Sequence, residues 1–382
     1  MSSLPVLRAR PDDMSAAARP LNMLALVGDA FGGAGGIAQY NRDLFSGLLR
    51  SGIVGSITVL PRHATASPVT PPGITQRPAP RTKLAFAAVA LKLALKRSAY
   101  DIVFCGHINF ARLAAAVARI AGARLVVQLH GFEAWEAPRG NLRRACDVAD
   151  LVLSVSRYTR GRFLGWSKLA PDHALVVPNT VSAAYTAGAD GGLRDKLGLG
   201  GKKVLLTVGR LDPRERYKGQ DRVIRLLQPL AATGHDCAYV IVGSGEDESR
   251  LKALAQDSQV TARVIFAGNV TYDDLPSYYR MADLFVMPST GEGFGIAFLE
   301  AMASGTPALG FRAGGTPDPM LDGDLGLLCE PDGEALLAAI RDALGEVPVD
   351  KTGLANRVHA HFGQEAFAAR CRELVQRLAH VD

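Results

Sequence analysis

Two glutamates flank a glycine-rich turn in PSTGEGFGIAFLEAMASGTP (288–307), Glu292 before the turn and Glu300 beyond it. Gly293 and Gly295 allow the backbone to come close to a ligand, and the helix expected to follow offers amides and positive potential at its N-terminus. Carboxylates in this setting can accept hydrogen bonds from the vicinal hydroxyls of a ribose or hexose, and a buried one needs a partner. Two solvated helix-end charges explain the stretch as well.

Two cations mark a second candidate site in TVGRLDPRERYKGQD (207–221). Arg210 and Lys218 lie between a strand-like run and a helix start, and a guanidinium fork with an ammonium charge suits a diphosphate. Solvated loop cations are the alternative interpretation. A similar strand–turn–helix pattern surrounds Gly243, where the signal is weaker.

A third glycine-rich turn, with Gly32 and Gly33, opens GDAFGGAGGIAQYNRDL (28–44). Such a turn before a helix can bind an anion through backbone amides. Its spacing is not GxGxxG and no acidic residue closes the next strand-like run, so a dinucleotide site is disfavoured. A flexible turn without a ligand remains possible.

The composition sets limits on these interpretations. The chain has 382 residues, 48% of them hydrophobic, which is enough for two buried cores. Its five cysteines are scattered and form no CxxC pair, which favours reduced thiols in a cytoplasmic protein over a disulfide frame or zinc site. The N-terminus lacks the apolar stretch of a secretory signal, and no apolar run is long enough to span a membrane.

The charge is uneven along the chain. Residues 1–185 hold 22 Lys and Arg against 10 Asp and Glu, whereas the rest holds 21 against 27. A basic first half suggests an acidic partner such as anionic lipid or a phosphorylated substrate. Nucleic acid is not expected, because the sequence contains no recognition module and no aromatic–basic interleaving.

Apolar runs alternate with helical patterns along the whole chain, which predicts an α/β protein. Continuous apolar strands separated by helices form parallel sheets covered on both faces, and two series of them predict two doubly wound, Rossmann-like domains facing each other across a cleft. The expected parts are a mobile tail, a first domain, a Gly-rich linker, a second domain, and a C-terminal helix packing back toward the first domain: 1–20, 21–185, 186–202, 203–360 and 361–382. The expected strands are 22–28, 55–60, 101–106, 124–130, 150–156, 174–179, 203–209, 238–243, 263–268, 283–288, 306–311 and 325–330.

The sequence resembles glycosyltransferase family 4, retaining enzymes of the GT-B fold that use sugar nucleotides. The resemblance covers about residues 22–375 and rests on the E-x7-E signature from Glu292 to Glu300, continued by AMASGTP, with GRL…YKG and VGSGE before it in the expected order. It implies a hexosyltransferase that takes a UDP- or GDP-sugar, with a sugar or lipid-linked sugar as acceptor.

The resemblance also implies roles for single residues. Arg210 and Lys218 would hold the donor's diphosphate, Glu292 would bind hydroxyls of the transferred sugar, and Glu300 those of the ribose. His130, at the end of VVQLHG, matches the active-site histidine beside the sugar. The remaining donor contacts would come from the glycine turns and one aromatic residue: Gly32, Gly33, Gly243, Gly293, Phe294 and Gly295.

No metal or other cofactor is expected. The two cations and helix-end amides can stabilise the leaving diphosphate, and the aspartates of DGD (322–324) are expected to be solvated in a turn. PNTVSAA (178–184) lacks the glycine and aspartate common in the family, and Asp318 stands where glutamate is common. A non-catalytic sugar-nucleotide-binding subunit, or an epimerase or phosphorylase on the same scaffold, remains the alternative.

Two basic segments of the first half suggest contact with a membrane. RTKLAFAAVALKLALKRSAY (81–100) is an apolar helical stretch with cations near its end, and SRYTRGRFLGWSK (156–168) combines four cations with Trp166. Basic residues with interfacial aromatics suit anionic lipid. We therefore expect a cytoplasmic protein, peripheral on the inner face of the membrane, with an acceptor such as a polyprenyl-diphosphate-linked sugar in cell-surface polysaccharide assembly.

Overall fold

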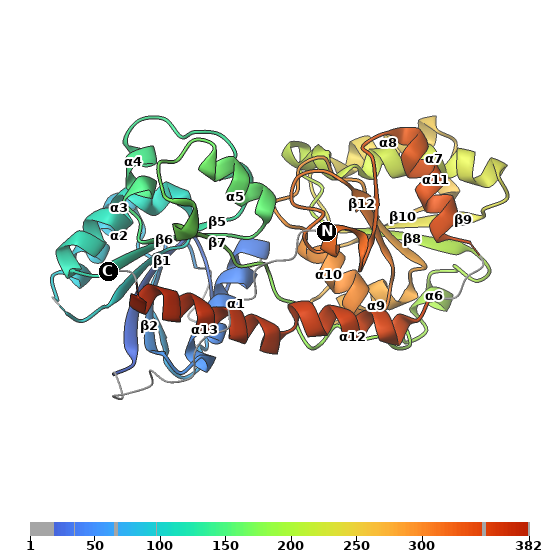
Figure 1. The fold of residues 1–382 in the computed structure, drawn as a ribbon. Coiled ribbons are helices and arrows are strands. Elements are labelled where there is room, and N and C mark those ends of the chain that lie inside the picture. The colour runs from blue at the N-terminus through green and yellow to red at the C-terminus, as the bar shows by residue number, and fades with distance from the viewer. Residues whose placement is uncertain (1–18, 34, 65–67, 97, 346–348, 381–382) are drawn as a thin grey trace.

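The two expected parallel sheets are both present in the computed structural model (Figure 1). The structure describes residues 19–33, 35–64, 68–96, 98–345 and 349–380. The expected mobile tail, 1–20, therefore lies outside the described residues except for its last two positions. The prediction of two doubly wound domains in the GT-B arrangement is confirmed.

The first sheet has seven parallel strands in the order β3-β2-β1-β4-β5-β6-β7. Its strands are β1 (Leu21–Val27), β2 (Val54–Pro61), β3 (Ile74–Gln76), β4 (Ile102–Cys105), β5 (Arg124–Leu129), β6 (Leu151–Ser154) and β7 (Ala174–Val176). Along β1, Met23, Ala25 and Val27 enter one apolar cluster while Leu24 and Leu26 enter another. Both faces of the sheet are thus buried, which is why its strands are continuously apolar.

Helices cover both faces of this sheet. Those of the first domain are α1 (Gly36–Arg50), α2 (Lys83–Ala94), α3 (Ala111–Ala121), α4 (Asn141–Asp147) and α5 (Arg157–Leu164), with short 3-10 turns η1 (Ile108–Phe110), η2 (Phe132–Ala134) and η3 (Pro171–His173). The cluster on one face takes residues from α2, α3 and α4, and the cluster on the other face takes residues from α1.

The second sheet has six parallel strands in the order β10-β9-β8-β11-β12-β13. They are β8 (Lys203–Val208), β9 (Cys237–Val242), β10 (Val264–Gly268), β11 (Leu284–Met287), β12 (Ala308–Phe311) and β13 (Leu327–Cys329). The helices around it are α6 (Leu193–Lys196), α7 (Gln220–Ala232), α8 (Glu248–Asp257), α9 (Leu275–Met281), α10 (Ile296–Ala303), α11 (Gly333–Ala343) and α12 (Lys351–Phe362), with η4 (Pro213–Lys218), η5 (Thr261–Arg263) and η6 (Leu321–Gly323). The predicted linker, 186–202, contains α6, which packs against α9.

The chain crosses between the domains at two neighbouring points. Near the first, Thr180 Oγ1 donates to the Phe362 carbonyl at 2.7 Å, and the Val181 amide donates to the same oxygen at 2.9 Å. At the second, α12 of the second domain gives way to α13 (Gln364–His380), which lies against α1 of the first domain (Figure 1). A Cβ added at Gly47 of α1 would lie 2.8 Å from the Cys371 sulfur, so these helices are in close contact.

One apolar cluster runs through both domains across this junction. It joins Tyr40 and Val177 on the first side to Phe294 and Phe362 on the second. Burial of this shared surface fixes how the two sheets face each other. Among the helices of the described residues, none has the length and apolar character needed to cross a bilayer.

Candidate functional site

A cavity of about 330 Å³ lies where the two domains meet. The first domain contributes His130, Glu133 and Asn179 to its lining, and the second contributes Lys218 and Glu292. Parallel sheets bind ligands at the carboxyl ends of their strands, and these residues follow β5, β7, β8 and β11. The cavity is therefore placed where a ligand would contact both domains.

Gly293 brings the two domains into backbone contact at this cavity. A Cβ there would lie 2.1 Å from the His130 carbonyl oxygen, and one at Gly131 would lie 3.0 Å from the Gly293 Cα. A side chain at Gly293 would thus force the domains apart. Gly295 precedes α10 with φ +94, a conformation that favours glycine. The Phe294 ring turns inward and packs edge-on against Phe362, with centroids 6.0 Å apart.

Glu292 presents an unpaired carboxylate oxygen within the site. Its Oε1 is buried and has no hydrogen-bond partner among the described residues. Burial raises the pKa of Glu292, and the positive charge of Lys218 opposes that rise. An unpaired buried acceptor costs about 1–3 kcal/mol. A ligand hydroxyl that donates to Oε1 would recover this cost, so the environment suits a polyhydroxylated ligand.

The two cations expected to bind a diphosphate are both held by Glu215. Lys218 Nζ donates to Glu215 Oε2 at 2.6 Å, and Arg210 contacts Oε1 of the same carboxylate. The side chains of Glu215 and Lys218 are 11% and 15% exposed, whereas that of Arg210 is 76% exposed. Sequence reasoning missed Glu215, although it lies between Arg210 and Lys218 in RLDPRERYK (210–218).

Arg210 also lines a second cavity, of about 520 Å³, outside β8. Gly243 lies beside it with φ +126, and a Cβ there would lie 2.0 Å from the Gly209 carbonyl oxygen. The ends of β8 and β9 can approach each other this closely because Gly243 has no side chain. The turn after β8, which bears Arg210, and the turn after β9, which bears Gly243, are thus adjacent in space.

Glu300 is partly buried on α10 and is already hydrogen-bonded. Tyr279 of α9 donates its hydroxyl proton to Glu300 Oε2 at 2.7 Å. Burial raises the pKa of Glu300, and this hydrogen bond opposes the rise. Glu300 is not among the residues lining the 330 Å³ cavity. No local sequence pattern indicates Tyr279 as a partner of Glu300, because it lies on another helix.

His130 is a neutral, oriented imidazole. Its Nε2 lies 2.9 Å from the Gly106 carbonyl oxygen, and a carbonyl can only accept, so Nε2 carries the proton and Nδ1 is left as an acceptor. Burial lowers the pKa of His130. The Tyr40 ring meets the imidazole edge-on, with centroids 5.4 Å apart. The neutral ring can therefore accept a hydrogen bond from a ligand hydroxyl at Nδ1.

The glycine-rich segment after β1 lines the 330 Å³ cavity, but not with the two glycines that were expected to do so. Among the described residues, Gly36 and Ile37 line the 330 Å³ cavity, and Gly32 and Gly33 do not. The Gly33 carbonyl instead accepts from Arg42 at 2.8 Å. The start of α1 is therefore the part of this segment that faces the site.

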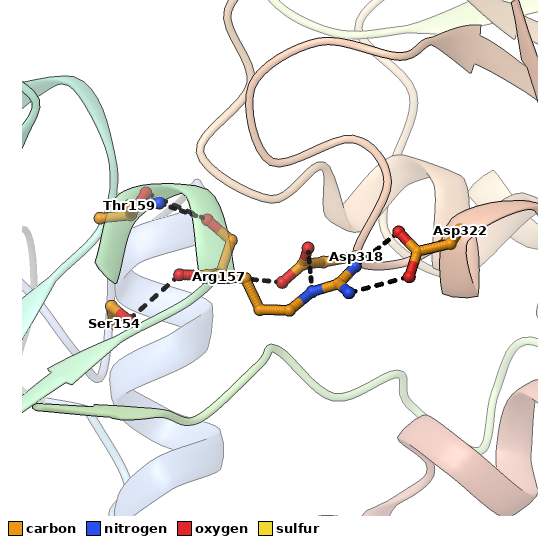
Figure 2. A network of polar contacts seen from close by, with 6 residues as sticks. Ser154, Arg157, Thr159, Asp318 and Asp322 are labelled. Atoms are coloured by element: carbon orange, nitrogen blue, oxygen red, sulfur yellow. Dashed lines mark hydrogen bonds and ion pairs between the residues drawn. The ribbon is translucent and has the colours of Figure 1, made fainter. Parts of the chain in front are cut away.

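One surface prediction is wrong and another is extended. The aspartates of the DGD turn are exposed, as expected, and Asp322 also forms an ion pair with Arg157 of the other domain at 2.7 Å (Figure 2). Trp166 was expected at a membrane surface, but it is buried and its Nε1 donates to the Ala134 carbonyl at 2.8 Å. Within the described parts of the chain, no group of three or more His, Cys, Asp or Glu side chains is placed to hold a metal ion.

Comparison with known proteins identifies both halves of the chain. The model of "Glycosyltransferase Family 4" matches residues 34–185, and that of "Glycosyl transferases group 1" matches residues 192–351. Together they include the cavity lining from both domains.

Curated relatives agree with these matches. A GDP-mannose-dependent alpha-(1-6)-phosphatidylinositol monomannoside mannosyltransferase of Mycolicibacterium smegmatis is 37% identical over 60% of this chain and 63% of its own length. A GDP-mannose-dependent monoacylated alpha-(1-6)-phosphatidylinositol monomannoside mannosyltransferase of Corynebacterium glutamicum is 30% identical over 78% of this chain and 81% of its own length. The match to the first relative thus spans less than two thirds of that protein.

Solved structures share the whole fold. Anabaena HepE, in complex with UDP and glucose, superposes with a TM-score of 0.73 at 21% identity, over 93% of this chain and 99% of that one. A glycosyltransferase from Rickettsia africae gives a TM-score of 0.78 at 15% identity, over 95% of this chain and 100% of that one. At these identities the likeness concerns the fold.

Proposed function

The chain belongs to glycosyltransferase family 4, and on that premise we propose that it is a retaining hexosyltransferase that uses a nucleoside-diphosphate sugar. The observation that carries the proposal is the buried, unpaired Glu292 Oε1 in a cavity that Lys218 also lines. The Glu292 carboxylate can accept a hydrogen bond from a sugar hydroxyl, and the Lys218 ammonium can bind a diphosphate in the same cavity. GDP-mannose is the first donor to test, because it is the donor named for the two mannosyltransferase relatives.

The proposed reaction depends on stabilising the leaving diphosphate. Lys218 and Arg210 lie together at the end of β8, and the amides at the start of α10 add positive potential. Their charge is in place before the glycosidic bond breaks, so no metal is required. Glu292 binds a sugar hydroxyl, and the acceptor attacks from the face that the diphosphate leaves. The departing diphosphate takes the acceptor's proton.

The acceptor we propose is a sugar or lipid-linked sugar, brought to the first domain at an anionic membrane surface. On α2 and just beyond it, Leu84 and Leu95 are 83% and 70% exposed, and Lys83, Lys92 and Lys96 are exposed beside them. Exposed leucines among lysines suit the headgroup region of anionic lipid. The 156–168 segment contributes less than its sequence suggested, because Trp166 is buried and Arg160 donates to the Ala174 and Pro171 carbonyls.

Release of nucleoside diphosphate from UDP-, GDP- and ADP-hexoses, with and without a glycolipid acceptor, tests the reaction. We expect release from one donor class, and loss of release in Lys218→Ala. Lys252→Ala is the matched control, because Lys252 is 56% exposed and pairs with Glu248 on α8, outside both cavities. Tight binding of a donor without turnover would favour the non-catalytic binding subunit, and an epimerised or phosphorolysed product would favour the other enzyme classes.

Flotation with vesicles tests the membrane proposal separately. The protein should float with vesicles that contain anionic lipid at low salt, and less well as the salt concentration rises. Replacing Leu84 and Leu95 by serine should reduce flotation while leaving donor binding intact. Absence of flotation at low salt would remove the membrane surface from the proposal without affecting the donor site.

A further inference from the structure

Arg157, the first residue of α5, connects the two domains through four hydrogen bonds (Figure 2). Its backbone amide and Nε donate to Asp318 at 2.7 and 3.0 Å, and its two terminal nitrogens donate to Asp322 at 2.8 and 2.7 Å. The guanidinium therefore contacts both carboxylates, and makes a two-pronged contact with that of Asp322. We name this group of three residues the Arg157 clasp.

The Asp318 end of the clasp differs from an ordinary surface ion pair. Its side chain is only 11% exposed, and it accepts the amide proton at the N-terminus of α5, where negative charge is favoured. Exposed ion pairs contribute little to stability, but two-pronged arginine–carboxylate contacts in a network are the stronger kind. The clasp can therefore hold a defined orientation of the domains.

The loop that bears Asp318 also supports the Glu292 turn. The Gly315 amide donates to the Glu292 carbonyl at 2.7 Å. A Cβ at Gly315 would lie 2.1 Å from the Gly293 carbonyl oxygen and 3.0 Å from Ser156 Oγ, which is the N-cap of α5. The loop is thus packed between α5 of one domain and the proposed sugar-binding turn of the other.

We propose that Arg157 is a positioning residue, which acts through Asp318 and Asp322 to keep the domains closed over the donor and the Glu292 turn in place. The consequence for the reaction rests on the proposed function. With the clasp broken, water can reach the donor's anomeric carbon. The water oxygen then bonds to the anomeric carbon as the bond between that carbon and the diphosphate oxygen breaks. A proton of the water passes to the diphosphate. The donor is hydrolysed in place of being transferred.

The test compares Arg157→Gln, Asp322→Asn and the double variant with the control Asp324→Asn. Asp322 has φ +57, a left-handed conformation that asparagine also tolerates, so this variant removes charge without backbone strain. Asp324 is exposed on the same turn and lies outside the clasp. Hydrogen exchange of the peptides over 156–160 and 314–322 reports the clasp directly. The ratio of donor hydrolysis to transfer reports its effect on the reaction.

Both clasp variants should exchange faster in these two peptides, and their hydrolysis-to-transfer ratio should rise about threefold or more as closure is lost. The double variant should add nothing to Arg157→Gln, since both changes remove the same contact. Wild-type exchange and an unchanged ratio in Arg157→Gln and Asp322→Asn would overturn the proposal. If Arg157→Gln does not fold, Asp322→Asn decides alone. Faster exchange with no turnover in the unaltered protein would refute the proposed function and leave the clasp standing.

Discussion

Replacing Glu215 by glutamine should tighten the binding of nucleoside diphosphates. The Glu215 carboxylate holds Lys218 Nζ at 2.6 Å and also contacts Arg210, so a diphosphate must compete with it for these cations. If a phosphate binds on the far side of the Lys218 ammonium, its charge lies roughly 8 Å from the carboxylate, and at an effective dielectric constant of about 20 the repulsion costs about 2 kcal/mol. Removing the charge should strengthen diphosphate binding by that amount, but the loss of a hydrogen bond that orients the cations offsets about 1 kcal/mol of this gain. The net gain of about 1 kcal/mol corresponds to a Kd about fivefold lower.

Calorimetric titration of UDP and GDP into both proteins measures this change. Glu248→Gln is the control, because it removes the same charge at another place. Glu248 pairs with Lys252 on α8 at 2.7 Å. The difference between Glu215→Gln and the unaltered protein should shrink in high salt, since it is electrostatic. A Kd that rises in Glu215→Gln would contradict this prediction, because it would mean that orientation of the cations outweighs competition for them.

The remaining predictions concern the glutamates, one half-buried aspartate and metal dependence. Glu292→Gln should lower kcat more than it raises the donor KM, because the sugar gains positive charge as its bond breaks. Glu300→Gln should mainly weaken donor binding, by about 1–3 kcal/mol. Steady-state kinetics separates these effects, and unchanged kinetics in both variants would remove the two glutamates from the donor site. Burial raises the pKa of Asp43 from the ordinary value of 3.8 to about 6. Ionisation of Asp43 therefore leaves the stability of the folded state unchanged below pH 3.8, lowers it as the pH rises, and has its full effect above pH 6. Asp43→Asn should therefore raise the free energy of unfolding at pH 8 by about 1–3 kcal/mol and have little effect at pH 4, which urea unfolding at both values checks. Transfer should survive EDTA, and loss of activity that Mg²⁺ or Mn²⁺ restores would contradict metal-independent departure.

The parallel sheets were predictable because their strands are buried on both faces. Every apolar run interpreted as a strand forms one, with ends that differ by a few residues. The missed strand is β3 (Ile74–Gln76), three residues at the sheet edge within a proline-rich stretch, too short to show a pattern. Glu292 and Lys218 could be proposed from the sequence because each lies between a strand and a helix start, and the structure places both in the lining of one cavity.

The residues that sequence reasoning missed are partners of the predicted ones. Glu215 and Tyr279 bind predicted site residues, yet their own types and spacing signal nothing. Arg157 and Asp318 are separated by 161 positions, and only the packing of two domains brings them together. Trp166 was placed at a surface because a pattern of cations and aromatics cannot tell an exposed ring from one buried beneath a helix.

Binding and turnover of GDP-mannose and UDP-glucose by the purified protein and by Glu292→Gln show whether the sugar is transferred in the cavity between the domains. We expect one donor to bind both proteins with similar affinity. Release of its nucleoside diphosphate should fall sharply in Glu292→Gln, and Lys218→Ala should lose binding as well. Equal turnover by the unaltered protein and Glu292→Gln would contradict the claim that the cavity between the domains is where the sugar is transferred.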